Sequence, residues 1–298
     1  MPTQTTKMGN SEWLLLFALA LLWGGSFFFI ELAIEGLRPF TIVLTRVGLA
    51  ALTLLTVAMM QGETIPRSVK TWGGFVIMSI VSNVLPFSLI TWGQTAIESG
   101  LASIMLATTP IFTVMLAHFF TADERLTLPR LIGVLLGVVG VTMLVGPSFL
   151  RGVGAQAMGQ LAVLAAAASY GVSALVARKM SGSTPLVNSA GMLSCATLFM
   201  LPLALIIEKP WTASPGFVPL LGAVALALVS TALAYLLYFR LVARAGASNA
   251  SLVTLLIPVT AVLLGAVFLG ERLPLIAFGG MGVIFCGLLV IDGRIFGR

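Results

Sequence analysis

The sequence predicts an all-α integral membrane protein whose ten transmembrane helices form two inverted five-helix repeats. Three observations lead to this prediction: the apolar composition, the spacing of the apolar runs, and a set of short motifs that occurs twice. Of the 298 residues, 59% are hydrophobic and 9% are charged, and the mean hydropathy is +1.10. A soluble domain carries about 25% charged residues, so most of this chain cannot face water.

The net charge of +6, from 16 basic and 10 acidic residues, fits a membrane protein better than a nucleic-acid-binding one. The longest basic run is the pair Arg178-Lys179, so we expect no nucleic-acid partner. Cys195 and Cys286 both lie in apolar runs and are expected to pack in the interior. We expect no cofactor and no metal site.

Ten apolar runs have the length of about 20 residues that a helix needs to cross the hydrocarbon core. The expected spans are 13–34, 40–60, 73–94, 100–121, 130–149, 159–178, 187–207, 218–239, 248–270 and 275–292. The linkers between them are short and carry polar and turn residues, which leaves no room for a domain outside the membrane.

The basic residues predict the orientation of these spans. With the N-terminus in the cytoplasm, 11 Lys and Arg residues fall in cytoplasmic segments and 4 on the opposite face. Cytoplasmic loops of membrane proteins are enriched in Lys and Arg. We therefore expect both termini to be cytoplasmic, as ten spans require.

Short motifs recur at a nearly constant spacing of 146 to 148 residues. The matching pairs are Trp23-Gly24-Gly25-Ser26 with Tyr170-Gly171-Val172-Ser173, Pro39 with Pro185, Pro110 with Pro258, Gly133 with Gly280, and Gly140 with Gly287. The chain thus divides into repeats at 1–150 and 151–298. Because each repeat holds five spans, the second must enter the membrane from the opposite side, as in many secondary transporters. The glycines of the last span in each half form small-residue faces that allow close helix packing.

The ordered motifs resemble those of the drug/metabolite transporter superfamily, in particular its ten-span EamA-type members. The matching pieces are Trp23-Gly24-Gly25-Ser26, Pro39 followed by Arg46, Pro110 followed by Glu124-Arg125, and Pro258 followed by Gly270-Glu271-Arg272. The resemblance covers essentially the whole chain. It implies a small-molecule substrate and a multi-pass protein of the bacterial inner membrane, and members of the superfamily carry amino acids, nucleosides, sugars or drugs.

Ionisable groups inside spans are costly and usually functional. Arg46 and Glu31 lie at similar depth near the outer ends of their spans, so we expect a structural ion pair; snorkelling of Arg46 or its direct contact with substrate are the alternatives. His118, near a cytoplasmic helix end, is either an interfacial residue or a proton carrier.

The remaining candidates are uncharged. We expect Asn83 and Tyr235 to touch substrate in a cavity near the midplane of the bilayer. The expected walls and gates also include Trp92, Tyr170, Tyr238, Thr108 and Thr231, with Pro110 and Pro258 as kink or gating residues. A proline inside a span frees a backbone carbonyl that a neighbour or a water-lined cavity must satisfy. The alternative for each Ser or Thr is a hydrogen bond to its own helix.

These features favour a secondary transporter that exports small neutral or zwitterionic metabolites by alternating access. The resemblance makes amino acids, including large neutral and aromatic ones, the first choice, with a nucleoside, sugar or drug as alternatives. Because no carboxylate or histidine lies at the midplane, we expect uncoupled, facilitative transport. A membrane-embedded enzyme acting on lipid-linked substrates is disfavoured, since it would need facing carboxylates, a metal site or an activated nucleophile.

Overall fold

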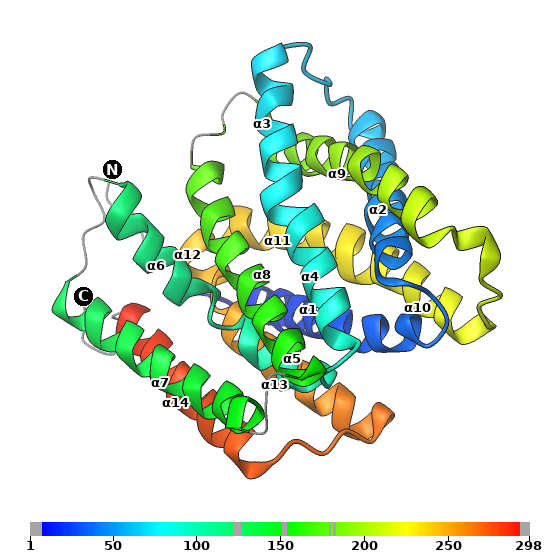
Figure 1. The fold of residues 1–298 in the computed structure, drawn as a ribbon. Coiled ribbons are helices and arrows are strands. Elements are labelled where there is room, and N and C mark those ends of the chain that lie inside the picture. Colours follow the sequence, from blue (N-terminus) through cyan, green and yellow to red (C-terminus); the bar gives the residue numbers. More distant parts are fainter. Residues whose placement is uncertain (1–7, 122–126, 151–153, 179, 181–182, 293–298) are drawn as a thin grey trace.

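The computed structural model describes residues 8–121, 127–150, 154–178, 180 and 183–292, and every regular element among them is helical. Eight helices are long and apolar enough to cross a membrane, and two shorter apolar helices, Val253–Leu269 and Leu275–Ile291, follow them. The predicted all-α fold with ten membrane helices is confirmed. Figure 1 shows these helices gathered into one bundle.

The first half begins with two uninterrupted helices and then two interrupted spans. Its elements are α1 (Asn10–Ile34), α2 (Pro39–Met60), α3 (Val69–Ser79), η1 (Ile80–Val84), α4 (Leu85–Gln94), α5 (Ser99–Leu106), α6 (Thr109–Phe120) and α7 (Leu128–Leu150). The elements α3, η1 and α4 form the third span, and α5 with α6 forms the fourth.

The second half repeats this order with more short segments. Its elements are α8 (Ala155–Ala177), α9 (Pro185–Pro202), η2 (Leu203–Glu208), η3 (Pro210–Thr212), α10 (Phe217–Ala227), η4 (Leu228–Leu233), α11 (Ala234–Ala245), α12 (Ala247–Ala250), α13 (Val253–Leu264), η5 (Gly265–Leu269) and α14 (Leu275–Asp292). The expected ends of the spans agree with these bounds to within a few residues at most places.

A π-helical turn interrupts the same span in each half. The turn η1 begins at Ile80 and η4 begins at Leu228, which matches the spacing of the repeated motifs. Such turns free backbone carbonyls and are frequent at functional sites. The hydroxyls of Ser169 and Thr231 donate to two carbonyls in these regions, Val81 O and Leu226 O, each over 2.8 Å.

The fourth span is broken, whereas its counterpart is not broken at the matching place. The helix α5 ends at Leu106 and α6 starts at Thr109, directly before Pro110. In the second half Pro258 lies inside the continuous helix α13. The interruption there comes earlier, between α12 and α13.

The last helices of the two halves, α7 and α14, run antiparallel and lie side by side (Figure 1). A Cβ atom added to Gly133 would lie 2.6 Å from the Gly287 carbonyl oxygen, and one added to Gly140 would lie 2.8 Å from the Gly280 carbonyl oxygen. Both distances are too short for any side chain, so the glycines here permit the close helix approach expected from the sequence.

Helices α1 and α8 make equivalent contacts with the opposite half. Gly24 on α1 approaches α13, where an added Cβ would lie 3.0 Å from the Ala261 nitrogen. Gly171 on α8 approaches α6, where an added Cβ would lie 3.1 Å from the Thr113 nitrogen. Each contact joins the first span of one half to the fourth span of the other, so the two contacts follow the spacing of the repeated motifs.

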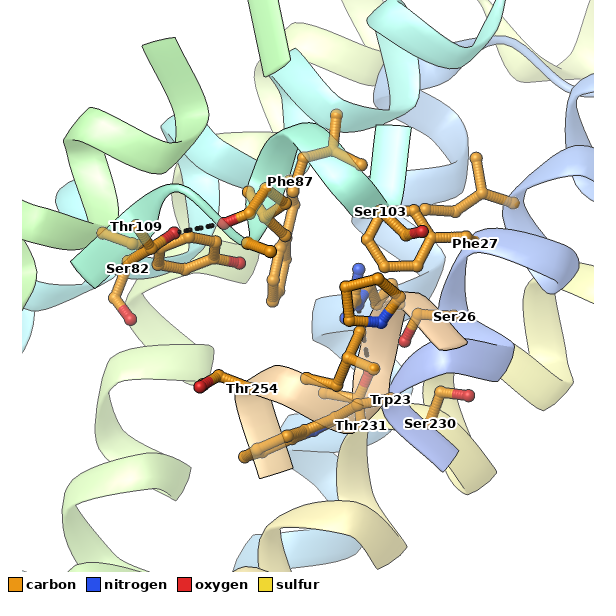
Figure 2. A pocket seen from close by; sticks show the side chains of 18 of the residues that line it. Trp23, Ser26, Phe27, Ser82, Phe87, Ser103, Thr109, Ser230, Thr231 and Thr254 are labelled. Atoms are coloured by element: carbon orange, nitrogen blue, oxygen red, sulfur yellow. Dashed lines mark hydrogen bonds between the residues drawn. The ribbon is translucent and has the colours of Figure 1, made fainter. Parts of the chain in front are cut away.

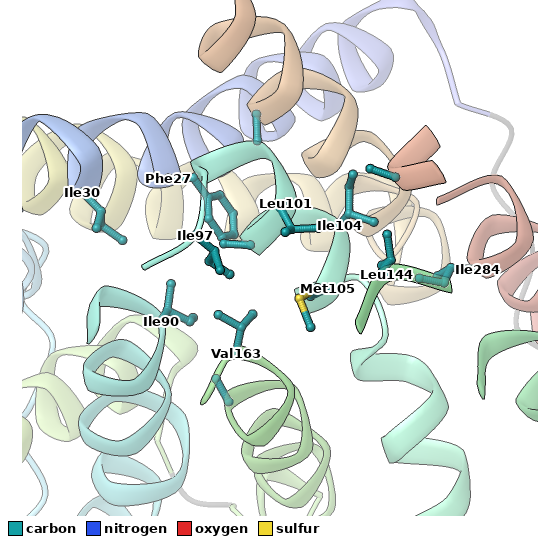
Figure 3. Close-up of a cluster of buried hydrophobic side chains, with 14 of the residues drawn as sticks. Phe27, Ile30, Ile90, Ile97, Leu101, Ile104, Met105, Leu144, Val163 and Ile284 are labelled. Atoms are coloured by element: carbon teal, nitrogen blue, oxygen red, sulfur yellow. The ribbon is translucent and has the colours of Figure 1, made fainter. Parts of the chain in front are cut away.

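The helix α5 lies at the centre of a buried apolar cluster. Seven of its eight residues are buried, and it packs against α1, α8 and α13. Figure 3 shows Leu101 toward Phe27, Met105 toward Val163, and Ile104 toward Leu144 and Ile284, all in one cluster. This packing fills the space between the two halves next to the cavity described below.

Two carboxylates of the second half cap helices of the first half. The Glu208 carboxylate accepts hydrogen bonds from the Phe40 N–H (2.9 Å), the Thr41 N–H (2.7 Å) and the Thr41 hydroxyl (2.8 Å) at the start of α2. The Glu271 carboxylate accepts the N–H groups of Ser99 (2.8 Å) and Gly100 (2.9 Å) at the start of α5. A carboxylate at a helix N-terminus satisfies orphan donors and complements the helix dipole.

Candidate functional site

A cavity of about 330 Å³ lies between the two halves. Its walls are aromatic rings, aliphatic side chains, hydroxyls and one guanidinium group. The lining residues are Trp23, Ser26, Phe27, Ile30, Arg46, Ser82, Phe87, Ile90, Ser103, Leu106, Ala107, Thr109, Pro110, Tyr170, Ser230, Thr231, Tyr235, Thr254, Ile257 and Pro258. Figure 2 shows Ser82 and Thr109 on one side of it and Ser26 and Ser230 on the other.

Arg46 is the charged residue of this lining. It lies about 10 Å along α2 from Pro39, at 1.5 Å per residue, and its side chain is only 7% exposed. Its Nε–H donates to the Thr231 hydroxyl over 3.0 Å, and its guanidinium carbon lies 3.6 Å from the centre of the Phe87 ring. The contact therefore links the second span of one half to the π-helical turn η4 of the other.

The ion pair predicted between Arg46 and Glu31 is wrong. The Glu31 carboxylate instead accepts a hydrogen bond from the Gln94 side-chain amide over 3.3 Å, and the same amide donates to the Phe27 carbonyl over 2.9 Å. The two side chains point in different directions around their helix axes, which the sequence prediction did not anticipate. Glu31 faces α4, whereas Arg46 faces η4.

Several residues proposed from the sequence do meet at the cavity. Tyr170, Tyr235 and Thr231 line it, and so do Pro110 and Pro258. Tyr170 comes from α8 and Tyr235 from α11, so the second half supplies both phenols. Their contact with a substrate remains a prediction.

Other proposed residues lie outside the lining. Trp92 is 45% exposed on the surface of the bundle. Tyr238 packs behind the cavity wall, with its ring centre 5.4 Å from that of Trp23. Thr108 lies between α5 and α6, and its hydroxyl donates to the Met105 carbonyl of α5 over 2.7 Å. This local bond within the span resembles the alternative considered for each Ser and Thr.

Asn83 is fully buried, and neither its side-chain nitrogen nor its side-chain oxygen has a hydrogen-bond partner. The repeat explains the difference from Thr231, which occupies the matching place in η4. The turn η4 packs against α2, and η1 correspondingly packs against α9. The residue of α9 that matches Arg46 is Met192, which offers no strong hydrogen-bonding group. Asn83 therefore occupies the position of Thr231 without a matching arginine.

Sequence reasoning missed Trp23, Ser26, Phe87 and Ser230 as lining residues. The hydroxyls of Ser26 and Ser230 are buried and have no hydrogen-bond partner. The repeat itself carried a usable signal for Trp23, because its motif matches that of Tyr170. No comparable signal pointed to Phe87.

The cavity lining contains no Asp, Glu or His. His118 lies in the last turn of α6, outside the lining, with its ring centre 5.0 Å from that of Phe119. Within the described part of the chain, no group of three or more His, Cys, Asp or Glu side chains could hold a metal ion. Glu124, Arg125 and Lys179 lie outside the described residues.

Comparison with known proteins now fixes the family. The model of the EamA-like transporter family matches twice, at residues 10–146 and 157–292. The chain belongs to the EamA-like transporter family. The two matches begin 147 residues apart, which is the spacing of the repeated motifs. An EamA-like chain with ten apolar helices is a multi-pass membrane protein that has a lipid bilayer around it and a small molecule as its substrate.

Named relatives of this EamA-like protein include transporters of Escherichia coli (strain K12). The chain is 29% identical to a probable amino-acid metabolite efflux pump over 293 residues, which cover 95% of each chain. It is 25% identical to the uncharacterized inner membrane transporter YedA, over 94% of this chain and 90% of that one. A solved crystal structure has the same fold, with a TM-score of 0.67 and 19% sequence identity over 95% of this chain and 97% of the other.

Proposed function

We propose that the protein is a facilitative exporter of small neutral or zwitterionic metabolites, above all amino acids, including large neutral and aromatic ones. The observation that carries this proposal is the cavity between the two halves. Its volume of about 330 Å³ falls at the small end of the ~300–1,000 Å³ typical of small-molecule sites, which suits a metabolite of amino-acid size. Its aromatic walls and scattered hydroxyls suit an amphipathic solute.

Alternating access follows from two halves that can exchange conformations. We propose that the repeats 1–150 and 151–298 are inverted in the membrane and that both termini are cytoplasmic. The antiparallel packing of α7 with α14 and the equivalent contacts of α1 and α8 support this arrangement. The similarity to an inner membrane transporter supports placement in the bacterial inner membrane.

The composition of the cavity supports uncoupled transport. A proton- or sodium-coupled carrier usually exposes a carboxylate or histidine alternately to each side of the membrane, and this lining contains neither. Arg46 cannot replace them as a proton carrier, because a guanidinium is not deprotonated in proteins. The concentration gradient of the substrate then drives export, and a tenfold gradient supplies about 1.4 kcal/mol.

The test is transport by the purified protein in sealed proteoliposomes. We expect labelled phenylalanine to exchange for unlabelled amino acids trapped inside, whereas trapped nucleosides and sugars give no exchange. Tyr170→Ala and Tyr235→Ala should slow the exchange, and Trp211→Ala, which alters an exposed residue of the short helix η3 outside the cavity lining, serves as the control. Exchange of nucleosides or sugars but not of amino acids would contradict the proposed substrate class.

The same vesicles test coupling. An imposed proton or sodium gradient should leave the equilibrium distribution of phenylalanine unchanged. Accumulation of phenylalanine above equal concentrations, driven by either gradient alone, would contradict uncoupled transport.

A further inference from the structure

The guanidinium group of Arg46 is a buried positive charge that has no acidic partner among the residues that the structure describes. The residue is only 7% exposed, and its contacts within the described residues are with the Thr231 hydroxyl and the Phe87 ring, neither of which is a carboxylate. No acidic residue lines the cavity that it faces. Glu31, the nearest expected partner from the sequence, bonds to Gln94 instead.

The contacts that Arg46 does make leave most of its donors unused. A guanidinium carries five N–H donors in a planar fork. Only the Nε–H has an acceptor in the described part of the chain, the Thr231 hydroxyl. The Phe87 ring covers one face of the guanidinium plane. These two contacts fix the orientation of the group and leave its terminal nitrogens available on the side of the cavity.

A buried charge without a counter-charge destabilises a fold, so the protein gains nothing in stability from this arrangement. Inside a membrane span such a group marks a binding site or a transport path by default. The planar fork of arginine matches the geometry of a carboxylate, to which it can donate two parallel hydrogen bonds. The unpartnered hydroxyls of Ser26 and Ser230, in the same cavity, provide further donors nearby.

We propose that Arg46 is the carboxylate-binding residue of the cavity and that the protein selects its substrates by their carboxylate rather than by their amine. Thr231 and Phe87 are positioning residues that hold the guanidinium for this contact. The absence of an acidic lining residue gives an ammonium group only hydroxyls and aromatic faces to contact. The inference rests on the proposed transport function, and it defines the substrate class by a carboxylate beside an apolar side chain, which zwitterionic amino acids share with monocarboxylate anions.

The first experiment uses the unmodified protein and four probes that share a phenyl ring. They are L-phenylalanine, 3-phenylpropanoate, which lacks the amine, and two amines without a carboxylate, L-phenylalaninamide and 2-phenylethylamine. Each is tested as a competitor of phenylalanine exchange and as a ligand that raises the melting temperature of the protein in detergent. We expect 3-phenylpropanoate to act within about tenfold of phenylalanine, and both amines to be at least about 30-fold weaker, since removing one member of a buried charge pair has an effect of this size.

The second experiment changes the arginine. In Arg46→Gln we expect binding of both carboxylates to weaken by about 30-fold or more and the preference over the two amines to disappear. Arg46→Lys keeps the charge but not the fork, so it should retain the preference with lower affinity. Arg240→Gln removes an exposed arginine outside the cavity lining and should bind all four probes like the unmodified protein.

The outcomes separate this inference from the proposed function. If 3-phenylpropanoate binds and phenylalanine does not, the carboxylate inference holds and the proposal of amino-acid export is wrong. If the amines bind as well as the carboxylates, or if no carboxylate raises the melting temperature, the inference about Arg46 is overturned. It is also overturned if folded Arg46→Gln protein keeps the full preference for carboxylates.

Discussion

Buried charged side chains at two places in the molecule differ in how many hydrogen bonds they make with the protein. Where the two halves meet at the starts of α2 and α5, the carboxylates of Glu208 and Glu271 each accept at least two hydrogen bonds from the opposite half. In the cavity, Arg46 donates one hydrogen bond to a neutral hydroxyl, and no carboxylate among the lining residues faces it. The carboxylates complete their hydrogen bonding within the protein, whereas the arginine does not.

This difference indicates different roles for the two sets of residues. A carboxylate that satisfies orphan N–H groups at a helix start stabilises the fold whether or not a ligand is present. An unpaired guanidinium lowers stability until an anion reaches it. Removing the carboxylates should therefore harm the ligand-free protein, and removing the guanidinium should harm only ligand binding.

The largest effect on stability is expected for Glu208→Ala. The change leaves two N–H donors at the start of α2 and the Thr41 hydroxyl without their acceptor, which should lower the free energy of unfolding by about 3 kcal/mol. Unfolding by SDS in mixed micelles measures it. Glu208→Gln keeps an acceptor oxygen and should lose about half as much. Equal stability of the unmodified protein, Glu208→Ala and Glu208→Gln would show that the Glu208 cap does not contribute to the free energy of unfolding.

For Arg46→Met we expect a gain in stability, where Glu208→Ala gives a loss. Replacing an unpaired buried charge by an apolar side chain of similar length should raise the free energy of unfolding of the ligand-free protein by about 1 kcal/mol or more. The rise in melting temperature that 3-phenylpropanoate causes should disappear in the same variant. A loss of ligand-free stability comparable to that of Glu208→Ala would mean that Arg46 is a structural residue.

Asn83→Leu should leave the stability unchanged or raise it by about 1 kcal/mol. The amide is buried without a partner, and an apolar group of similar shape avoids the desolvation cost of such a group. Because Asn83 does not line the cavity, the affinity for carboxylates should stay the same. A tenfold loss of affinity would support the role of Asn83 in substrate contact that the sequence predicts.

A small loss of carboxylate affinity is expected for Thr231→Val, a change that nearly conserves the volume of the side chain. The guanidinium keeps its charge but loses the acceptor of its Nε–H, so carboxylate affinity should fall by about fivefold, the equivalent of about 1 kcal/mol. Competition by 3-phenylpropanoate measures it. An effect as large as that of Arg46→Gln would place Thr231 itself in contact with the ligand.

The positions of the spans could be predicted from the sequence because lipid imposes a simple requirement on the length and polarity of a membrane-spanning segment. The repeated motifs also indicated which spans correspond in the two halves. The contacts of Gly24 with α13 and of Gly171 with α6 follow the spacing of these motifs. The breaks within spans were only partly predictable. Pro110 marks one, but Pro258 lies inside a continuous helix.

The candidate site was harder to predict than the spans. The sequence indicates how far along a span a residue lies, but it gives less information on the direction in which its side chain points around the helix axis. Arg46 and Glu31 were placed at similar depth, yet they face different neighbours. A span that is apolar on all sides gives no amphipathic pattern from which to infer direction. Asn83 and Thr231 show the same limit: they match in the repeat, but only Thr231 has an arginine opposite it.

The most direct test of the central claim is an experimental structure of the protein with 3-phenylpropanoate bound. We expect both carboxylate oxygens to lie about 2.7–2.9 Å from the terminal nitrogens of Arg46, the spacing of a bidentate charge-assisted pair, with the phenyl ring against the aromatic wall of the cavity. A carboxylate bound elsewhere, with Arg46 still in contact only with Thr231 and Phe87, would contradict it.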